Sequence, residues 1–109
     1  MIAVIFEVTL NAEGKTRYFE MAQALKGALS QVDGFISVER FQSLSDADSF
    51  LSLSFWQSEA AILQWKTHFE HQLAQEKGKS ELFSNYRIRV SNVLRDYGYG
   101  CNATNKEGS

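Results

Sequence analysis

The sequence has little that would tie the protein to nucleic acid, a membrane or an oxidising compartment. Its single cysteine, Cys101, cannot form an internal disulfide, which fits a reducing environment. The formal net charge is -2, so there is no general electrostatic attraction to nucleic acid. No apolar run approaches the roughly 20 residues needed to cross a bilayer. Residues 1–7 lack the basic lead and cleavage site of a signal peptide, and we expect a strand there. We therefore expect a soluble cytoplasmic protein.

The chain also lacks the motifs that would name a reaction. It contains no metal-ligand cluster at the usual spacings, no phosphate-binding loop and no catalytic triad. What is present is a hydrophobic fraction of 44% in 109 residues, enough for the core of one domain. A chain of this size gains stability by burying a face against a second subunit.

Hydrophobic periodicity predicts six elements in the order β-α-β-β-α-β. They are a strand over 2–9, a helix over 16–31 that Gly34 stops, strands over 35–42 and 50–56, a helix that Ser58 caps and that runs toward Gly78, and a strand over 86–94. Two interlocked β-α-β units of this kind form a ferredoxin-like α+β sandwich, a four-stranded antiparallel sheet with both helices on one face. We expect this domain to span 1–97, followed by a disordered tail over 98–109.

The second helix contains both histidines. On a straight helix His71 would lie about 180° from Ile62 and point to water. A break near Thr67 would instead turn His71 and Ala74 inward, and we expect that break.

The strand positions fall into two alternating sets. One set is plainly apolar and includes Val4, Phe6, Val8, Ile36, Val38, Leu51, Leu53, Phe55, Ile88 and Val90. The other set is mixed, with Ile5, Glu7, Glu39, Phe41, Ser52, Ser54, Trp56, Arg87, Arg89 and Val93. Apolar residues on both faces predict a twofold dimer in which two sheets pack together. Two small serines beside Trp56 predict a hollow that a ligand could fill.

Several segments together carry a family resemblance. They are Gly34-Phe-Ile-Ser-Val-Glu-Arg-Phe41, Leu51-Ser-Leu-Ser-Phe-Trp56, Trp65-Lys66, His71-Gln-Leu-Ala-Gln-Glu-Lys-Gly78, Tyr86-Arg-Ile-Arg-Val90 and Arg95-Asp-Tyr97. In these segments, and over about residues 2–97, the chain resembles the antibiotic biosynthesis monooxygenase family, and more narrowly its uncharacterised bacterial branch.

The resemblance implies a dimeric α+β barrel. Some members of the family oxygenate phenols or quinols with O2 and use neither metal nor flavin. In those members the substrate anion reduces O2, while the protein holds the ring, favours the anion and excludes water. Relatives with the same fold degrade haem.

The match to individual family residues is uneven. Trp56 corresponds to a strand-end tryptophan of a polyketide-oxidising member, but Ser52 stands where that member has asparagine. Trp65 corresponds to the helix tryptophan of the haem-degrading branch. The strand asparagine of that branch falls on Phe6, and its haem-ligating histidine falls near Leu73, which argues against haem degradation.

Each candidate residue also has an ordinary structural interpretation. His71 is a candidate general base for a phenol proton, or else an exposed helix residue. Arg89 is a candidate for holding an anion, or else a partner of Glu7 or Glu39 across the sheet. Trp56 and Trp65 are candidates for a pocket wall, or else core residues.

Together with the residues, the family resemblance implies a homodimeric, cofactor-independent monooxygenase acting on a small aromatic phenol or hydroquinone with O2. The predicted catalytic residues are His71 and Arg89, and the predicted substrate-binding residues are Phe6, Ser52, Trp56 and Trp65. The alternative is a non-catalytic dimer that binds a small molecule, as in a stress response, with haem degradation as a third possibility. No metal site, nucleic-acid partner or membrane contact is expected.

Overall fold

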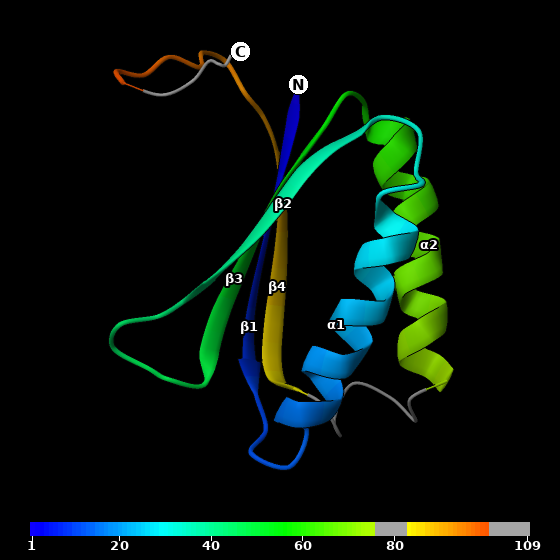
Figure 1. The fold of residues 1–109 in the computed structure, drawn as a ribbon, viewed down its shortest axis with the longest axis vertical. Helices are drawn as coiled ribbons and strands as arrows, with labels where there is room; N and C mark the ends of the chain where they lie inside the picture. Colours follow the sequence, from blue (N-terminus) through cyan, green and yellow to red (C-terminus); the bar gives the residue numbers. More distant parts are fainter. Residues whose placement is uncertain (76–82, 101–109) are drawn as a thin grey trace.

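The computed structural model describes residues 1–75 and 83–100, with the backbone alone for 70–75 and 83. The elements follow one another as β1 (Ile2–Leu10), α1 (Lys15–Leu29), β2 (Phe35–Gln42), β3 (Ser49–Trp56), α2 (Glu59–Gln75) and β4 (Phe83–Asn92). The four strands form one antiparallel sheet in the order β2-β3-β1-β4. Both helices cover the same face of this sheet (Figure 1). The predicted ferredoxin-like α+β fold is therefore confirmed. Residues 101–109 of the predicted tail, including Cys101, lie outside the described residues.

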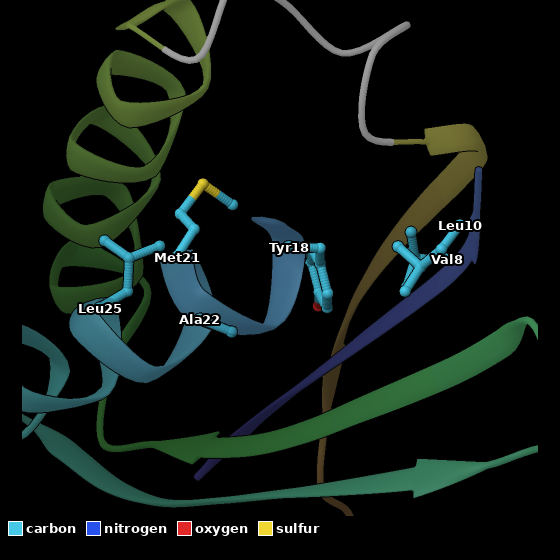
Figure 2. Packing of buried hydrophobic residues seen from close by; sticks show 6 residues of the cluster. All are labelled: Val8, Leu10, Tyr18, Met21, Ala22 and Leu25. Atoms are coloured by element: carbon cyan, nitrogen blue, oxygen red, sulfur yellow. The ribbon is translucent and has the colours of Figure 1, made fainter. Parts of the chain in front are cut away.

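The core consists of two groups of buried side chains between the sheet and the helices. The first group joins one end of β1 to α1 (Figure 2) and contains Val8, Leu10, Tyr18, Met21, Ala22 and Leu25. The second contains Leu29, Trp56, Ala61 and Ile62. The half-buried Trp65 of α2 packs against both groups and so links them. The apolar side of α1, with Tyr18, Met21, Ala22, Leu25 and Leu29, is the side that faces this core.

The second helix runs without interruption through Thr67, so the predicted break is wrong. The Thr67 hydroxyl donates a hydrogen bond to the carbonyl of Leu63, one turn earlier, at 3.1 Å. Such a bond satisfies the side chain within a continuous helix. The helix begins as predicted, with the backbone N–H of Ala61 donating a long 3.5 Å bond to Ser58 Oγ.

The register of the strands corrects the predicted faces. Phe6 lies opposite Ser52 on β3, and Val4 lies opposite Ser54. Directly opposed residues share a sheet face, so the serines and Trp56 face the helices together with Val4 and Phe6. Leu51, Leu53 and Phe55 therefore lie on the other face, with Glu7, Ile5 and Ala3, and were assigned to the wrong set.

A bulge near the start of β2 corrects a second assignment. The register shifts between Phe35, which lies opposite Trp56, and Ser37, which lies opposite Phe55. The extra residue, Ile36, is 46% exposed and does not share the inward face with Val38 as predicted. Phe35 packs on Trp56 instead, with ring centroids 5.3 Å apart. A single inserted residue changes the phase of the alternation, which explains the error.

Gly34 occupies the turn that brings β2 against the start of α2. Its φ is 95°, a value that disfavours residues with a side chain. A Cβ placed there would lie 3.0 Å from the Cβ of Ala61, and the Gly34 carbonyl accepts a 2.7 Å bond from the N–H of Gln57. Both its conformation and its surroundings therefore require glycine.

We predict that Gly34→Ala lowers the free energy of unfolding by about 1–3 kcal/mol, because a left-handed conformation is strained with a Cβ. Gly27→Ala is the matched control, since nothing lies within 4 Å of a Cβ at that helical position. The control should stabilise the protein by roughly 0.5–1 kcal/mol. Urea unfolding measures both, and equal midpoints for the two variants would contradict this account of the turn.

Candidate functional site

A cavity of about 430 Å³ lies between the helix-facing side of the sheet and the two helices. Its volume is within the roughly 300–1,000 Å³ typical of small-molecule sites. Residues of all four strands and both helices line it. All four predicted substrate-binding residues are among them, namely Phe6, Ser52, Trp56 and Trp65.

The floor of the cavity is hollow because β3 presents small side chains there. Ser52 and Ser54 occupy two successive inward positions of this strand, beside Phe6 and Val4 of β1. Larger residues at these positions would fill the space beneath the helices. The hollow that the sequence predicted next to Trp56 is therefore present.

Trp56 forms a fixed wall of the cavity. It is 1% exposed, and its indole Nε1–H donates a 2.9 Å hydrogen bond to Ser54 Oγ. Its ring meets that of Phe35 edge to face. This bond satisfies the buried indole donor, so the tryptophan holds its orientation whether or not a ligand is present. Trp56 thus combines the two interpretations that the sequence left open, since it is both a core residue and a pocket wall.

The α2 side of the cavity is aromatic. Phe69 meets Phe6 edge to face at a centroid distance of 5.8 Å, and Trp65 lines the cavity one helical turn before Phe69. The exposed His68 ring lies against Trp65, 5.5 Å away between centroids. Flat apolar surfaces of this kind favour an aromatic or other flat apolar ligand.

Besides Ser52 and Ser54, the buried Tyr18 and the half-buried Arg40 bring polar groups into the apolar lining. Tyr18 is 4% exposed and extends from α1 toward the sheet (Figure 2). Burial raises the pKa of its hydroxyl, while the charge of Arg40 and a hydrogen bond to Arg40 act in the opposite direction. The hydroxyl therefore stays neutral at ordinary pH.

Arg40 of β2 places a charged group in the floor of the cavity. Its Nε is buried and has no acceptor among the residues that the structure describes. Leaving a buried donor unpaired costs about 1–3 kcal/mol, and more when the group is charged. Arg40 was not predicted from the sequence, because an arginine next to Glu39 in an alternating strand has the pattern of an exposed pair. Its position could have been predicted from the spacing, because Arg40 is two residues after the inward-facing Val38 and so lies on the same face of β2.

The rim of the cavity carries exposed charged residues. Lys26 of α1 and Glu59, Leu63 and Lys66 of α2 line the cavity and are all exposed, so the cavity is open to solvent along these residues. Within the described lining, three cationic side chains, Lys26, Arg40 and Lys66, accompany the single carboxylate of Glu59. The site is thus locally basic, although the protein as a whole has a net charge of -2.

The two predicted catalytic residues do not join this lining in the described structure. Arg89 lies opposite Ile5, on the face without helices, and its Nη1 donates to Glu7 Oε1 at 3.0 Å. The predicted cross-sheet ion pair is therefore present. The backbone of His71 belongs to α2, but its side chain is outside the description, so its role stays a prediction.

Two kinds of feature are absent from the described residues, a metal-ligand cluster and a membrane-spanning helix. No three histidine, cysteine, aspartate or glutamate side chains within residues 1–75 and 83–100 are grouped as a metal site would require. In the same ranges, no helix is long and apolar enough to span a membrane.

Solved structures share this fold at low sequence identity. Rv0793 from Mycobacterium tuberculosis superimposes with a TM-score of 0.74 at 16% identity, over 89% of this chain and 98% of that chain. PA3566 from Pseudomonas aeruginosa gives a TM-score of 0.70 at 20% identity, over 86% and 94% of the two chains. These similarities concern the fold alone.

Curated relatives are closer in sequence. The chain is 40% identical over 93 residues to the jasmonate monooxygenase ABM of Pyricularia oryzae. The matched segment covers 85% of this chain but 43% of that relative, so the chain spans less than half of the relative's length. It is 38% identical over 94 residues to the uncharacterised protein YqjZ of Bacillus subtilis, covering 85% of this chain and 79% of that protein. The model of the antibiotic biosynthesis monooxygenase family matches residues 1–77. With this match and two relatives near 40% identity, the chain belongs to the antibiotic biosynthesis monooxygenase family.

Proposed function

We propose that the protein is a monooxygenase that oxidises a small aromatic phenol or hydroquinone with O2 and without a metal or flavin. The observation that carries the proposal is the aromatic-walled cavity of about 430 Å³, with a half-buried arginine in its floor whose Nε is buried. A flat phenol fits such walls, and a nearby cation favours its ionised form. Family membership and the relative named as a jasmonate monooxygenase support the reaction class.

The proposed reaction needs no external reductant. A hydroquinone and O2 give a hydroxyquinone and water, and a phenol and O2 give a quinone and water. One oxygen atom enters the product, the other leaves as water, and the substrate supplies all four electrons. Loss of the phenolic proton makes the ring electron-rich enough to reduce O2, and the apolar walls keep water from the intermediate. The protein therefore has to hold the ring, accept the proton and stabilise the anion.

In this proposal Phe6, Trp56 and Trp65 hold the ring and Ser52 leaves room for it. His71 takes the phenolic proton, a role that histidine performs near neutral pH. Arg89 is left out of the pocket, because its charge is paired with Glu7 on the opposite face of the sheet. We place the reaction in the cytoplasm, since a chain with one cysteine suits a reducing compartment.

We further propose that the working protein is a homodimer formed through the helix-free face of the sheet. That face carries the apolar side chains of Ile5, Leu51, Leu53 and Phe55, and the 45% exposed Phe41. The ion pair of Glu7 and Arg89 lies among them. A second copy would present the same patch, so a twofold axis would match apolar side chains with each other. This contact would leave the cavity, on the other face, accessible.

We predict that Ser52→Leu lowers substrate-dependent oxygen uptake on the order of 100-fold, because the larger side chain displaces the ring from its position. The assay measures O2 consumption above autoxidation with a panel of hydroquinones and anthrones and metal-stripped protein. Ser45→Leu makes the same change in an exposed loop and should retain the wild-type rate. If the wild-type protein binds members of the panel but consumes no O2 with any of them, a non-catalytic binding dimer is favoured.

His71→Ala should lower the rate about 100-fold, since general base catalysis typically contributes 10²–10⁴. The affinity for a phenol should change little, because the ring is held by the aromatic walls. His68→Ala is the matched control, as that exposed side chain lies against Trp65 outside the lining of the cavity. An unchanged rate for His71→Ala would remove this residue from the mechanism.

For the assembly, we expect light scattering at micromolar concentration to give twice the 12.4 kDa subunit mass. Leu53→Arg should halve the measured mass, because it places a charge in the apolar patch. Leu44→Arg makes the same change at a fully exposed loop position and should leave the mass unchanged. A wild-type mass near that of one subunit would exclude the dimer at this concentration.

A further inference from the structure

We propose that Arg40 is the residue that binds the substrate anion, so that the phenol lies in the cavity as a phenolate with its oxygen at the β2 side. This inference deepens the proposed function and rests on it for the class of substrate. Arg40 takes the role for which the sequence had pointed to Arg89.

The sheet register places Arg40 in the floor of the cavity. Arg40 lies opposite Ser52 on β3, and Ser52 lies opposite Phe6 on β1. A row of inward-facing residues therefore crosses the sheet from a charged group, over a small hydroxyl, to an aromatic ring. A phenolate lying along this row would place its oxygen near the guanidinium and its ring over the hollow at Ser52.

The guanidinium has unused binding capacity at this point. Its Nε is buried without an acceptor in the described part of the chain, and no carboxylate of the described residues forms an ion pair with it. An oxyanion next to a buried N–H of arginine forms a charge-assisted hydrogen bond, which is shorter and stronger than one between neutral groups. The interior also weakens screening by water, so the charge acts more strongly on a bound ligand than an exposed charge would.

Tyr18 positions this arginine without neutralising it. Burial raises the pKa of its hydroxyl, and this effect outweighs the charge of Arg40 and hydrogen bonding to Arg40, which act to lower the pKa, so the hydroxyl remains uncharged. A carboxylate in the same place would cancel the positive charge. A neutral partner fixes the guanidinium and leaves its charge available for a ligand. We regard Tyr18 as a positioning residue for this reason.

The other cations are less suited to the task. Lys26 and Lys66 lie at the exposed rim, where water and salt screen their charges. Arg89 is paired with Glu7 on the opposite face. The remaining titratable side chains of the described lining are Tyr18 and Glu59. Glu59 is exposed on α2, so it has little influence on an oxyanion beside Arg40.

The test uses 4-nitrophenol, whose phenolate absorbs visible light, in anaerobic buffer so that no turnover occurs. Titration with pH reports the pKa of the bound phenol. We expect the wild-type protein to favour the phenolate by about tenfold relative to free solution, which corresponds to one pKa unit. Arg40→Met should remove this preference, and Arg40→Lys should restore part of it.

Arg17→Met is the matched control, because Arg17 is an exposed arginine of α1 outside the lining of the cavity. It should leave the phenolate preference unchanged. Tyr18→Phe should reduce the preference without abolishing it, as expected of a positioning residue. Circular dichroism and a thermal melt of Arg40→Met establish that the variant is folded. If that variant is unfolded, Arg40→Lys and Tyr18→Phe decide the question.

The results separate this inference from the proposed reaction. A phenolate preference that depends on Arg40, without oxygen uptake, would support the anion site and contradict the reaction. Oxygen uptake with the same preference in Arg40→Met would support the reaction and overturn the anion site. Failure of the wild-type protein to bind 4-nitrophenol at millimolar concentration would also overturn it.

Discussion

The two inward serines of β3 are the constraint on which the cavity depends. Ser52 and Ser54 stand in the middle of the sheet, where a strand covered by helices ordinarily carries valine, isoleucine or leucine. Their small volume leaves the space between the sheet and the helices partly empty. Because the hydroxyl of Ser54 also accepts the indole hydrogen of Trp56, one of the two residues both creates the space and fixes its wall. The hollow is thus a result of strand sequence and register, with the helices as its cover.

Aromatic side chains connect the second helix, α2, to the sheet across the cavity. Phe6 and Phe69 meet edge to face at 5.8 Å, and Trp65 packs against both core groups. Large rings at the boundary of a cavity reach across it, so a helix can remain packed although the floor beneath it has only small residues. The same rings provide the flat surfaces that a planar ligand needs. Stability of the domain and shape of the site therefore depend on the same side chains.

The order of the elements was predictable from sequence, because periodicity and turn residues determine it locally. The faces were not, since Ile2, Val4, Ile5 and Phe6 are apolar on both phases of β1 and give no preference. Only the pairing of β1 with β3 decides that Ser52 lies beside Phe6, and pairing is a long-range property. The bulge at Ile36 was not predictable for the same reason. The alternation of apolar and polar residues in β2 does not reveal one inserted residue, which only the pairing with β3 shows. The expected helix break followed from assigning His71 to the interior, whereas backbone hydrogen bonding keeps α2 continuous.

On β2 and β3 several polar side chains face the helices and several apolar ones face away, the reverse of what a single subunit requires. Arg40, Ser52 and Ser54 face the helices, while Phe41, Leu51 and Leu53 face away from them. A monomer without ligand would gain stability from the reverse arrangement, because apolar residues would then be covered and the arginine hydrated. Departures from local rules of this kind are expected where function is selected. Under the two proposals made above, these departures have separate explanations on opposite faces of the same strands. An anionic ligand would complete the interactions of Arg40, and a second copy of the chain would cover the leucines and Phe41.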